Sequence, residues 1–215
     1  MGETAIVVGA TGLVGRALTD QLVDADHISS VVTLTRRPAL HSSPKVCNKV
    51  VNFDSLKDHA PLFKGDLMFS CLGTTHKQAG SIEAQRKVDL DYQYEAAQLA
   101  VGQGVRHYLL VSSFRADADN TNAYLKMKGE LEKRVQDLPF ERISIFQPSL
   151  LTGPRLELRM GEKTLGRILP AICLMPGLRR FRPIQGEQVA AKMVRVSRTP
   201  GNALERFVLD DIFAM

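Results

Sequence analysis

The sequence predicts an α/β protein built on a doubly wound parallel sheet. Short apolar runs alternate with segments of helical periodicity, and a glycine-rich turn joins the first run to the first helical segment. A continuous apolar run is typical of a strand that is buried on both faces, as in a parallel sheet covered by helices on both sides. Right-handed crossovers between such strands give the doubly wound arrangement.

Strands are expected at the apolar runs 4–9, 30–35, 49–53, 66–72, 107–112 and 142–146, and helices at 13–23, 81–101 and 122–137. After Pro148, prolines and glycines cluster and the pattern weakens, leaving a short helix near 187–196 and a last strand near 207–209. We therefore expect residues 1–150 to form a dinucleotide-binding core. Residues 151–215 are expected to form a short substrate-covering segment, a small C-terminal lobe packed on the same domain.

Length and composition support one globular domain with at most a small lobe. The chain has 215 residues, of which 44% are hydrophobic and 24% charged, and this composition excludes a disordered protein. Its cysteines, Cys47, Cys71 and Cys173, have no metal-ligand spacing and favour a reducing compartment. No signal peptide is evident, and no stretch approaches the roughly 20 apolar residues of a membrane span. We therefore expect a cytoplasmic protein without a membrane span.

Basic side chains are concentrated between residues 155 and 182. This segment has seven basic and two acidic residues, so it accounts for the whole net charge of +5. One interpretation is a solvated basic surface, and another is a lobe that contacts an anionic ligand. Nucleic acid is a weaker candidate because the segment has few aromatic residues and no recognised nucleic-acid-binding motif.

The segment 9–15 reads Gly-Ala-Thr-Gly-Leu-Val-Gly and connects the first strand to the first helix. Gly9 permits the tight turn, Gly12 lets the backbone approach a pyrophosphate, and Gly15 lets the helix pack closely on the strand. The helix N-terminus offers free N–H groups and a partial positive charge to the phosphates. We expect these glycines to bind a dinucleotide together with Thr11 and Leu13; the alternative is a strand-to-helix turn without a ligand.

The end of the second strand predicts a preference for NADP(H) over NAD(H). NAD-binding sheets usually carry an acid there to accept a hydrogen bond from the ribose 2′-hydroxyl, whereas this chain has Arg36 and Arg37. Guanidinium groups form bidentate, charge-assisted hydrogen bonds to phosphate, which suits a 2′-phosphate. Arg16 follows the third glycine and is expected near the same site. The alternative, above all for Arg37, is a side chain that points to solvent.

Two further segments are expected to contact the cofactor. Asp54 follows the third strand, where its carboxylate either accepts from the adenine amino group or caps the next short helix. Leu72, Gly73 and Thr74 follow the fourth strand, where a glycine lets the backbone pass close to the cofactor ribose and a hydroxyl can bond it. For this second segment, the alternative is an ordinary turn.

A serine, a tyrosine and a lysine form a candidate catalytic set. Ser112 and Ser113 end the fifth strand, at the edge of the sheet where ligands bind. Tyr124 and Lys128 are four residues apart, so both face the same side of a helix. A neighbouring ammonium favours the phenolate and lowers the tyrosine pKa from about 10, which allows proton exchange with a carbonyl or alcohol oxygen. A serine hydroxyl on the adjacent strand end can hold that oxygen.

The order of the glycine turn, the serine and Tyr-x-x-x-Lys resembles the short-chain dehydrogenase/reductase superfamily, of the extended or atypical kind. More closely, the segments 71–75, 111–113 and 124–130 look like those of the oxidoreductases related to human Tat-interacting protein. The resemblance spans nearly the whole chain. It implies a Rossmann-like NAD(P)-binding fold, NADPH binding, and Ser113, Tyr124 and Lys128 as the catalytic residues. It also implies a cofactor contact at Pro148, where the superfamily runs the chain past the nicotinamide, and a possible homodimer.

The chain departs from the superfamily pattern at three places. Extended members usually carry Val-Tyr-Gly shortly after the serine, where this chain reads Phe-Arg-Ala from Phe114. Their fourth helix commonly begins with an asparagine, where this chain has acids at Asp89 and Asp91. The segment after Pro148 is also shorter than their substrate lobe. These departures count against sugar-nucleotide chemistry.

Three functions are compatible with these residues. The first is an NADP-dependent oxidoreductase that transfers hydride between a carbonyl and an alcohol of a small molecule, with Ser113, Tyr124 and Lys128 in the roles given above. The second is an NADPH-binding regulatory or sensor protein without turnover. The third is a nucleotide-sugar epimerase or dehydratase.

Overall fold

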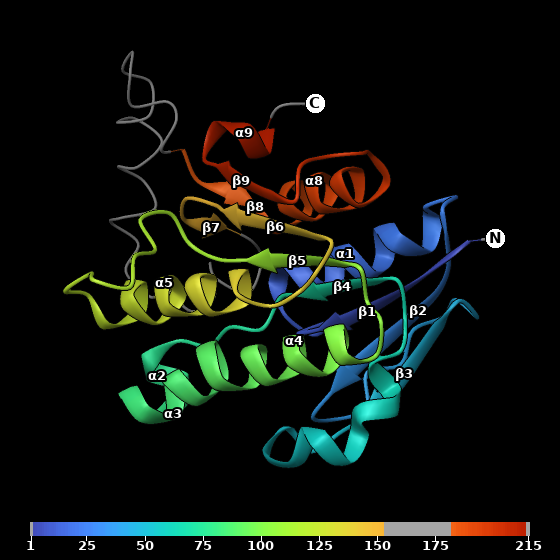
Figure 1. The fold of residues 1–215 in the computed structure, drawn as a ribbon, viewed down its shortest axis with the longest axis horizontal. Coiled ribbons are helices and arrows are strands. Elements are labelled where there is room, and N and C mark those ends of the chain that lie inside the picture. Colours follow the sequence, from blue (N-terminus) through green and yellow to red (C-terminus); the bar gives the residue numbers. More distant parts are fainter. Residues whose placement is uncertain (1, 153–181, 214–215) are drawn as a thin grey trace.

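The fold is a seven-stranded sheet in the order β3-β2-β1-β4-β5-β6-β9, and the computed structural model describes residues 2–152 and 182–213 (Figure 1). Every pairing in this sheet is parallel. The predicted doubly wound α/β class is confirmed, with the strand order reversing between β1 and β4. The strands are β1 Glu3–Val8, β2 Ile28–Thr35, β3 Val46–Val50, β4 Leu67–Ser70, β5 His107–Val111, β6 Arg142–Gln147 and β9 Leu204–Val208.

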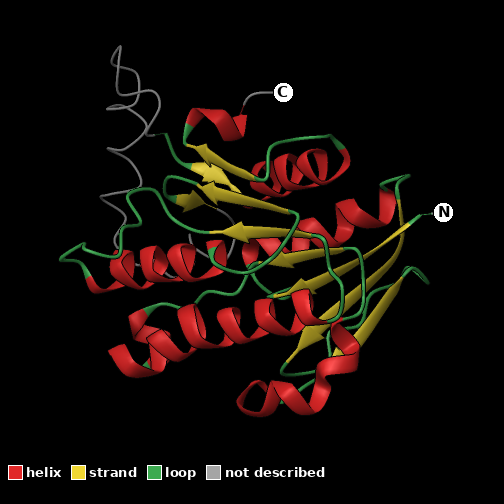
Figure 2. Ribbon diagram, in the orientation of Figure 1, coloured by secondary structure: helices red, strands yellow, loops and turns green. Residues whose placement is uncertain are grey.

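Helices cover both faces of the sheet (Figure 2). One face is covered by α1 (Leu13–Asp24) and α8 (Gly186–Arg198), and the other by α4 (Tyr92–Gly102) and α5 (Ala123–Gln136). Successive residues of a strand point to opposite faces, so β1 divides its side chains between two cores. Ala5 and Val7 pack in the core beneath α1 and α8, whereas Ile6 and Val8 pack in the core beneath α4 and α5.

The third strand begins and ends earlier than the expected 49–53. It spans Val46–Val50, at the edge of the sheet, and Phe53 begins a 3₁₀-helical segment, Phe53–Phe63. The Asn52 side chain accepts a hydrogen bond from the backbone N–H of Asp54, so the chain turns into the helix directly after the strand. Val50 is exposed because an edge strand has a neighbour on only one side.

The helix expected over 81–101 is interrupted by a π-helical segment. It consists of α3 (Ile82–Arg86), the π-helical segment Lys87–Asp91, and α4. A short helix α2 (His76–Ala79) precedes it. Short π-helical segments within α-helices are frequent at functional sites, and this one carries Asp89, which is fully buried.

The last part of the chain completes the sheet. Strand β9 pairs with β6, and α8 packs against α1, where Gly186 contacts Leu13. The helix and strand expected near 187–196 and 207–209 are therefore present, with bounds that differ by a few residues. The remaining elements are β7 (Leu151–Thr152), which pairs with β8 (Ile184–Gln185), and α9 (Asp210–Phe213).

Residues 153–181 of the segment expected to cover the substrate lie outside the described residues. These include six of the seven basic residues of the 155–182 cluster; only Arg182 is described. The substrate-covering role of this segment therefore stays a prediction. In the described part of the chain, no helix has the length and apolar character needed to cross a membrane.

Candidate functional site: a cavity at the carboxyl edge of the sheet

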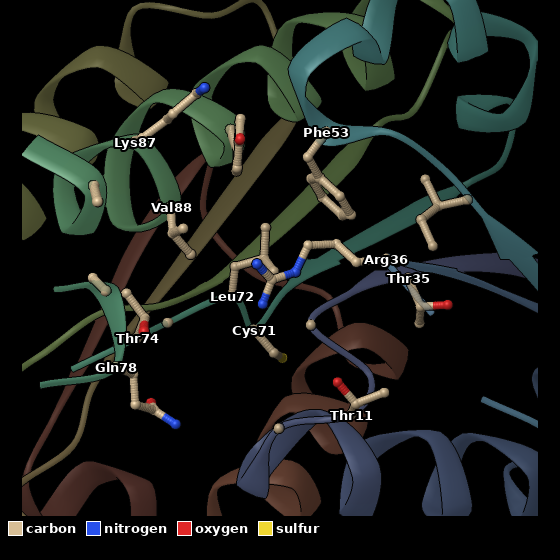
Figure 3. A pocket seen from close by; sticks show the side chains of 17 residues that line it. Thr11, Thr35, Arg36, Phe53, Cys71, Leu72, Thr74, Gln78, Lys87 and Val88 are labelled. Carbon is tan, nitrogen blue, oxygen red and sulfur yellow. The ribbon is translucent and has the colours of Figure 1, made fainter. Parts of the chain in front are cut away.

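A cavity of about 540 Å³ opens at the carboxyl ends of β1, β2 and β4 (Figure 3). Its volume lies within the usual range of ligand pockets, roughly 300–1,000 Å³. It is located where the strand order reverses, which is where doubly wound sheets bind their ligands. Of the residues expected to bind a dinucleotide, it is lined by Gly9, Thr11, Gly12, Arg36, Leu72, Gly73 and Thr74.

The glycine turn has the geometry that the sequence pattern requires. Gly9 has φ +82°, and a Cβ atom there would lie 2.4 Å from the backbone carbonyl carbon of Cys71. A Cβ atom on Gly15 would lie 2.2 Å from the carbonyl oxygen of Gly9, so Gly15 brings α1 against the turn. The N–H of Gly12 donates to that same oxygen over 2.9 Å. Only glycine avoids these overlaps at positions 9 and 15.

The N-terminus of α1 is open to an anion. No side chain in the described ranges caps it, and its first turn contains no acidic residue. The first N–H groups of a helix have no partner within the helix and carry a partial positive charge. Because Gly12 and Thr11 line the cavity at this helix end, a pyrophosphate fits there without displacing a side-chain cap.

The arginines after β2 have different positions. Figure 3 shows the Arg36 side chain extending across the cavity toward Leu72. Arg37 is exposed and is not among the lining residues, and its carbonyl oxygen accepts a hydrogen bond from the Thr35 hydroxyl over 2.8 Å. Arg16 and Leu13 line a second cavity, of about 270 Å³, beside the glycine turn. Of Arg16, Arg36 and Arg37, the structure thus places Arg36 in the larger cavity.

Asp54 is exposed and does not line the cavity. Its carboxylate accepts hydrogen bonds from the Tyr92 hydroxyl and, over 2.6 Å, from the Lys87 ammonium, and both of these residues line the cavity. The hydrogen bonds from Lys87 and Tyr92 lower the pKa of Asp54. Asn52, and not Asp54, is the N-cap of the helical segment that follows. Among the described residues, Asp54 is therefore connected to the cavity through its hydrogen bonds with Lys87 and Tyr92.

The segment after β4 forms a second wall of the cavity, and it begins next to the glycine turn. The N–H of Thr74 donates to the Asp89 carboxylate over 3.0 Å, and the Thr74 carbonyl accepts from the Gln85 side chain over 3.2 Å. Cys71 begins this wall, and burial raises the pKa of its thiol to about 12. The Cys71 thiol is therefore neutral near pH 7 and contributes no charge to the cavity.

The two serines after β5 have different surroundings. Ser112 is buried, and its hydroxyl donates to the buried carboxylate of Glu132 on α5. The same carboxylate accepts from Gln147 over 2.9 Å and 3.0 Å, and burial raises the pKa of Glu132. Ser113 is half-buried, and its hydroxyl makes no hydrogen bond to another described residue. Ser112 therefore has a structural partner, and neither serine lines the 540 Å³ cavity.

Tyr124 and Lys128 lie on the same side of α5, as expected from their spacing. The Asn122 side chain caps this helix by accepting from the N–H groups of Tyr124 and Leu125, which fixes Tyr124 in the first turn. Lys128 is buried, and its ammonium lies 3.5 Å from the carbonyl oxygen of Val111 at the end of β5. Neither residue lines the 540 Å³ cavity.

Asp89 is the residue that sequence reasoning did not assign to the site. Its Oδ1 lies 3.5 Å from the Lys128 ammonium, so one carboxylate contacts both the cavity wall at Thr74 and the candidate catalytic lysine. The superfamily commonly has an asparagine at the start of this helix, and this chain has an acid there. That difference is the sequence signal that points to Asp89.

Pro148 is buried directly after β6 and does not line the cavity. Its carbonyl accepts a hydrogen bond from the N–H of Phe114 over 3.0 Å, which ties together the segments that follow β5 and β6. No group of His, Cys, Asp or Glu side chains within the described ranges is arranged to hold a metal ion.

Comparison with known proteins gives consistent results. A family model described as NAD(P)H-binding matches residues 9–155. The rat protein HTATIP2 is 37% identical over 164 residues, which cover 74% of this chain and 67% of that protein. A protein named "FMP52, mitochondrial" from Debaryomyces hansenii is 31% identical over 202 residues, which cover 92% of this chain and 88% of that protein. The resemblance inferred from the sequence motifs is thereby confirmed.

Solved structures share the fold. MoeE5 in complex with UDP-glucuronic acid and NAD has a TM-score of 0.71 at 14% identity, and covers 96% of this chain and 76% of its own. A short-chain dehydrogenase/reductase superfamily protein from Agrobacterium tumefaciens with bound NAD has a TM-score of 0.70 at 16% identity, with 96% and 77% covered. At these identities the likeness extends to the fold alone.

Proposed function

Because the chain belongs to the NAD(P)H-binding family, we propose that it is an NADP-dependent oxidoreductase that transfers hydride between a carbonyl and an alcohol of a small molecule. The observation that carries the cofactor choice is the position of Arg36. It extends into the cavity between the glycine turn and Leu72, and no acid of the described residues lines that cavity. A guanidinium at this place favours the 2′-phosphate of NADP(H) over a free ribose hydroxyl.

The remaining cavity residues fit the other parts of the dinucleotide. The uncapped end of α1, beside Gly12, suits the pyrophosphate. Phe53 and Tyr92, whose ring centroids are 5.5 Å apart, offer aromatic surface to the adenine. Asp54 fixes the Tyr92 ring in this position by accepting hydrogen bonds from the Tyr92 hydroxyl and the Lys87 ammonium. When bound, NADPH supplies the hydride that the reaction needs.

In the proposed mechanism, the residues of this chain bind and protonate the substrate. Ser113 orients the substrate oxygen through its hydroxyl, because Ser112 is already occupied by Glu132. Tyr124 donates a proton to that oxygen, and the Lys128 ammonium favours the phenolate that remains. The lysine also holds the cofactor ribose, as the family resemblance implies.

A titration of the purified protein with NADPH and with NADH tests the cofactor proposal. Arg36→Ala is expected to weaken NADPH binding by about 1–3 kcal/mol, the usual range for a charge-assisted hydrogen bond, with little effect on NADH. Arg37→Ala is the matched control, because it removes an adjacent guanidinium that does not line the cavity. Equal affinity of the wild-type protein for both nucleotides would refute the NADP preference.

The variant Tyr124→Phe tests the catalytic proposal and separates it from the alternatives. It is expected to abolish carbonyl reduction while NADPH still binds. If the wild-type protein binds NADPH but consumes none of it across a broad panel of carbonyls, a regulatory or sensor protein is the better description. NAD that stays bound through purification would favour a nucleotide-sugar epimerase or dehydratase, the chemistry of some proteins with this fold, such as a dTDP-glucose 4,6-dehydratase.

Location and assembly are separate parts of the proposal. We propose a cytoplasmic protein, and the alternative is mitochondrial, the word in the names of the fungal relatives. Subcellular fractionation of the tagged chain decides between these. A homodimer stays a prediction, and light scattering during gel filtration measures it.

A further inference from the structure

Asp89 and Lys128 form a buried ion pair next to the cavity. The side chains are 0% and 3% exposed, and the Asp89 Oδ1 atom lies 3.5 Å from the Lys128 ammonium. This oxygen makes no hydrogen bond within the described residues, whereas Oδ2 accepts from the N–H of Thr74. A buried charge is costly unless an opposite charge accompanies it, so each of these two groups requires the other.

Asp89 belongs to a row of three buried polar side chains on one side of the interrupted helix, and hydrogen bonds from this row hold it in place. Gln85, Asp89 and Gln93 are spaced four residues apart along the interrupted helix, and all are buried. The Gln85 amide donates to the Thr74 carbonyl over 3.2 Å, and the Gln93 amide donates to the Asp89 carbonyl over 2.8 Å. The Gln93 side chain also accepts a hydrogen bond from the Ser70 hydroxyl over 2.8 Å, which connects this row of side chains to β4.

We propose that Asp89 is a positioning residue, which fixes the Lys128 ammonium relative to the cavity wall at Thr74. The proposal rests on the proposed function, in which Lys128 acts together with Tyr124. The Asp89 carboxylate accepts a hydrogen bond from the N–H of Thr74 through Oδ2 and faces the Lys128 ammonium through Oδ1. Asp89 therefore keeps the distance between Thr74 and Lys128 constant.

The other groups near Lys128 do not replace Asp89. Cys71 has a pKa raised to about 12 and is neutral. Glu132 lies one turn further along α5, and its carboxylate is engaged by Ser112 and Gln147. Burial raises the pKa of Asp89, and the Lys128 charge opposes that shift. Among the described residues, Asp89 is the carboxylate in direct contact with the lysine.

A double-mutant cycle tests the pair without any enzyme assay. The variants are Asp89→Asn, Lys128→Met and the double variant, and the readout is the melting temperature. Each single variant is expected to melt at a lower temperature, and the double variant to recover much of the loss, because it leaves neither charge unpaired. Losses that simply add would overturn the pairing. If Asp89→Asn does not fold, the double variant compared with Lys128→Met gives the same answer.

The NMR signal of Lys128 tests the positioning role. In protein labelled with ¹³C-lysine, the signal that Lys128→Met removes belongs to Lys128. Asp89→Asn is expected to change the chemical shift of this signal and to broaden it, because the ammonium loses the carboxylate that holds it in place. Asp91→Asn is the matched control, since it removes an exposed carboxylate from the same π-helical segment. An unchanged Lys128 signal in Asp89→Asn would overturn the proposal.

Activity measurements then distinguish this proposal from the proposed function. With a reducible carbonyl, Asp89→Asn is expected to lower kcat and to move the alkaline limb of its pH profile to lower pH. A wild-type pH profile in Asp89→Asn would refute the positioning role and leave the proposed function intact. A changed Lys128 signal in a protein that turns over no carbonyl would support the pair and refute the proposed function.

Discussion

The hydroxyl of Ser112 donates to the buried carboxylate of Glu132, which leaves the adjacent Ser113 as the serine without such a partner in the described structure. Sequence alone favoured Ser113 only by analogy with the family. The structure adds a physical reason, because a hydroxyl that satisfies a buried carboxylate is costly to withdraw from it.

We predict that Ser112→Ala and Ser113→Ala affect different properties: the first variant loses stability and the second loses activity. Ser112→Ala should reduce the free energy of unfolding by about 1–3 kcal/mol, since it removes a hydrogen bond from a buried carboxylate. Ser113→Ala should leave stability nearly unchanged and reduce turnover of a carbonyl substrate. Urea denaturation and steady-state kinetics on both variants provide the test. Full activity in Ser113→Ala would exclude it as the residue that orients the substrate.

We predict that Gly15→Ala destabilises the protein and weakens nucleotide binding together. The new Cβ atom would lie 2.2 Å from the Gly9 carbonyl oxygen, so α1 must move away from the turn. Gly102→Ala is the matched control: Gly102 ends α4, and a Cβ atom there meets nothing within 4 Å. That control should be neutral or stabilising by about 0.4–1 kcal/mol. Thermal melting and NADPH titration measure both effects, and wild-type behaviour of Gly15→Ala would contradict the packing.

We predict that His107 makes the protein less stable in acid. Burial lowers the pKa of His107 to about 3, and its ring nitrogen lies 2.9 Å from the Ser144 hydroxyl in β6. Between about pH 6.5 and pH 3 the unfolded chain binds a proton at this histidine that the folded chain does not bind. Stability therefore falls as the pH falls through this range, with a slope of at most about 1.4 kcal/mol per pH unit from this residue.

Urea denaturation at pH 7, 6, 5 and 4 measures this dependence. His107→Gln should flatten it, although the variant starts from a lower stability at pH 7 because the packing of the imidazole is lost. His76→Gln is the control, because His76 is exposed. If His107→Gln retains the wild-type slope, other groups cause the acid sensitivity.

Much of the fold was predictable because its signals are local. The apolar runs and the glycine spacing identify the parallel strands and the phosphate-binding turn, and both depend on near neighbours in the sequence. The third strand was placed wrongly by a few residues, because an edge strand such as Val46–Val50 is only partly buried and its apolar pattern is weak.

The site was less predictable because its contacts are distant in sequence. The sequence allowed both Arg36 and Arg37 to contact the cofactor, with solvent as the alternative above all for Arg37, and the structure shows that Arg36 extends into the cavity. The contact between Asp89 and Lys128 joins residues 39 positions apart and depends on a π-helical segment that has no sequence signature.

The position of β9 has a consequence for how the chain is synthesised. Strand β6 ends at Gln147, but its outer neighbour is formed by Leu204–Val208, near the end of the chain. As the polypeptide leaves the ribosome, β6 therefore exposes unpaired backbone groups until the last strand emerges. During that interval the nascent chain is open to association with other polypeptides, and a chaperone that shields β6 would protect it.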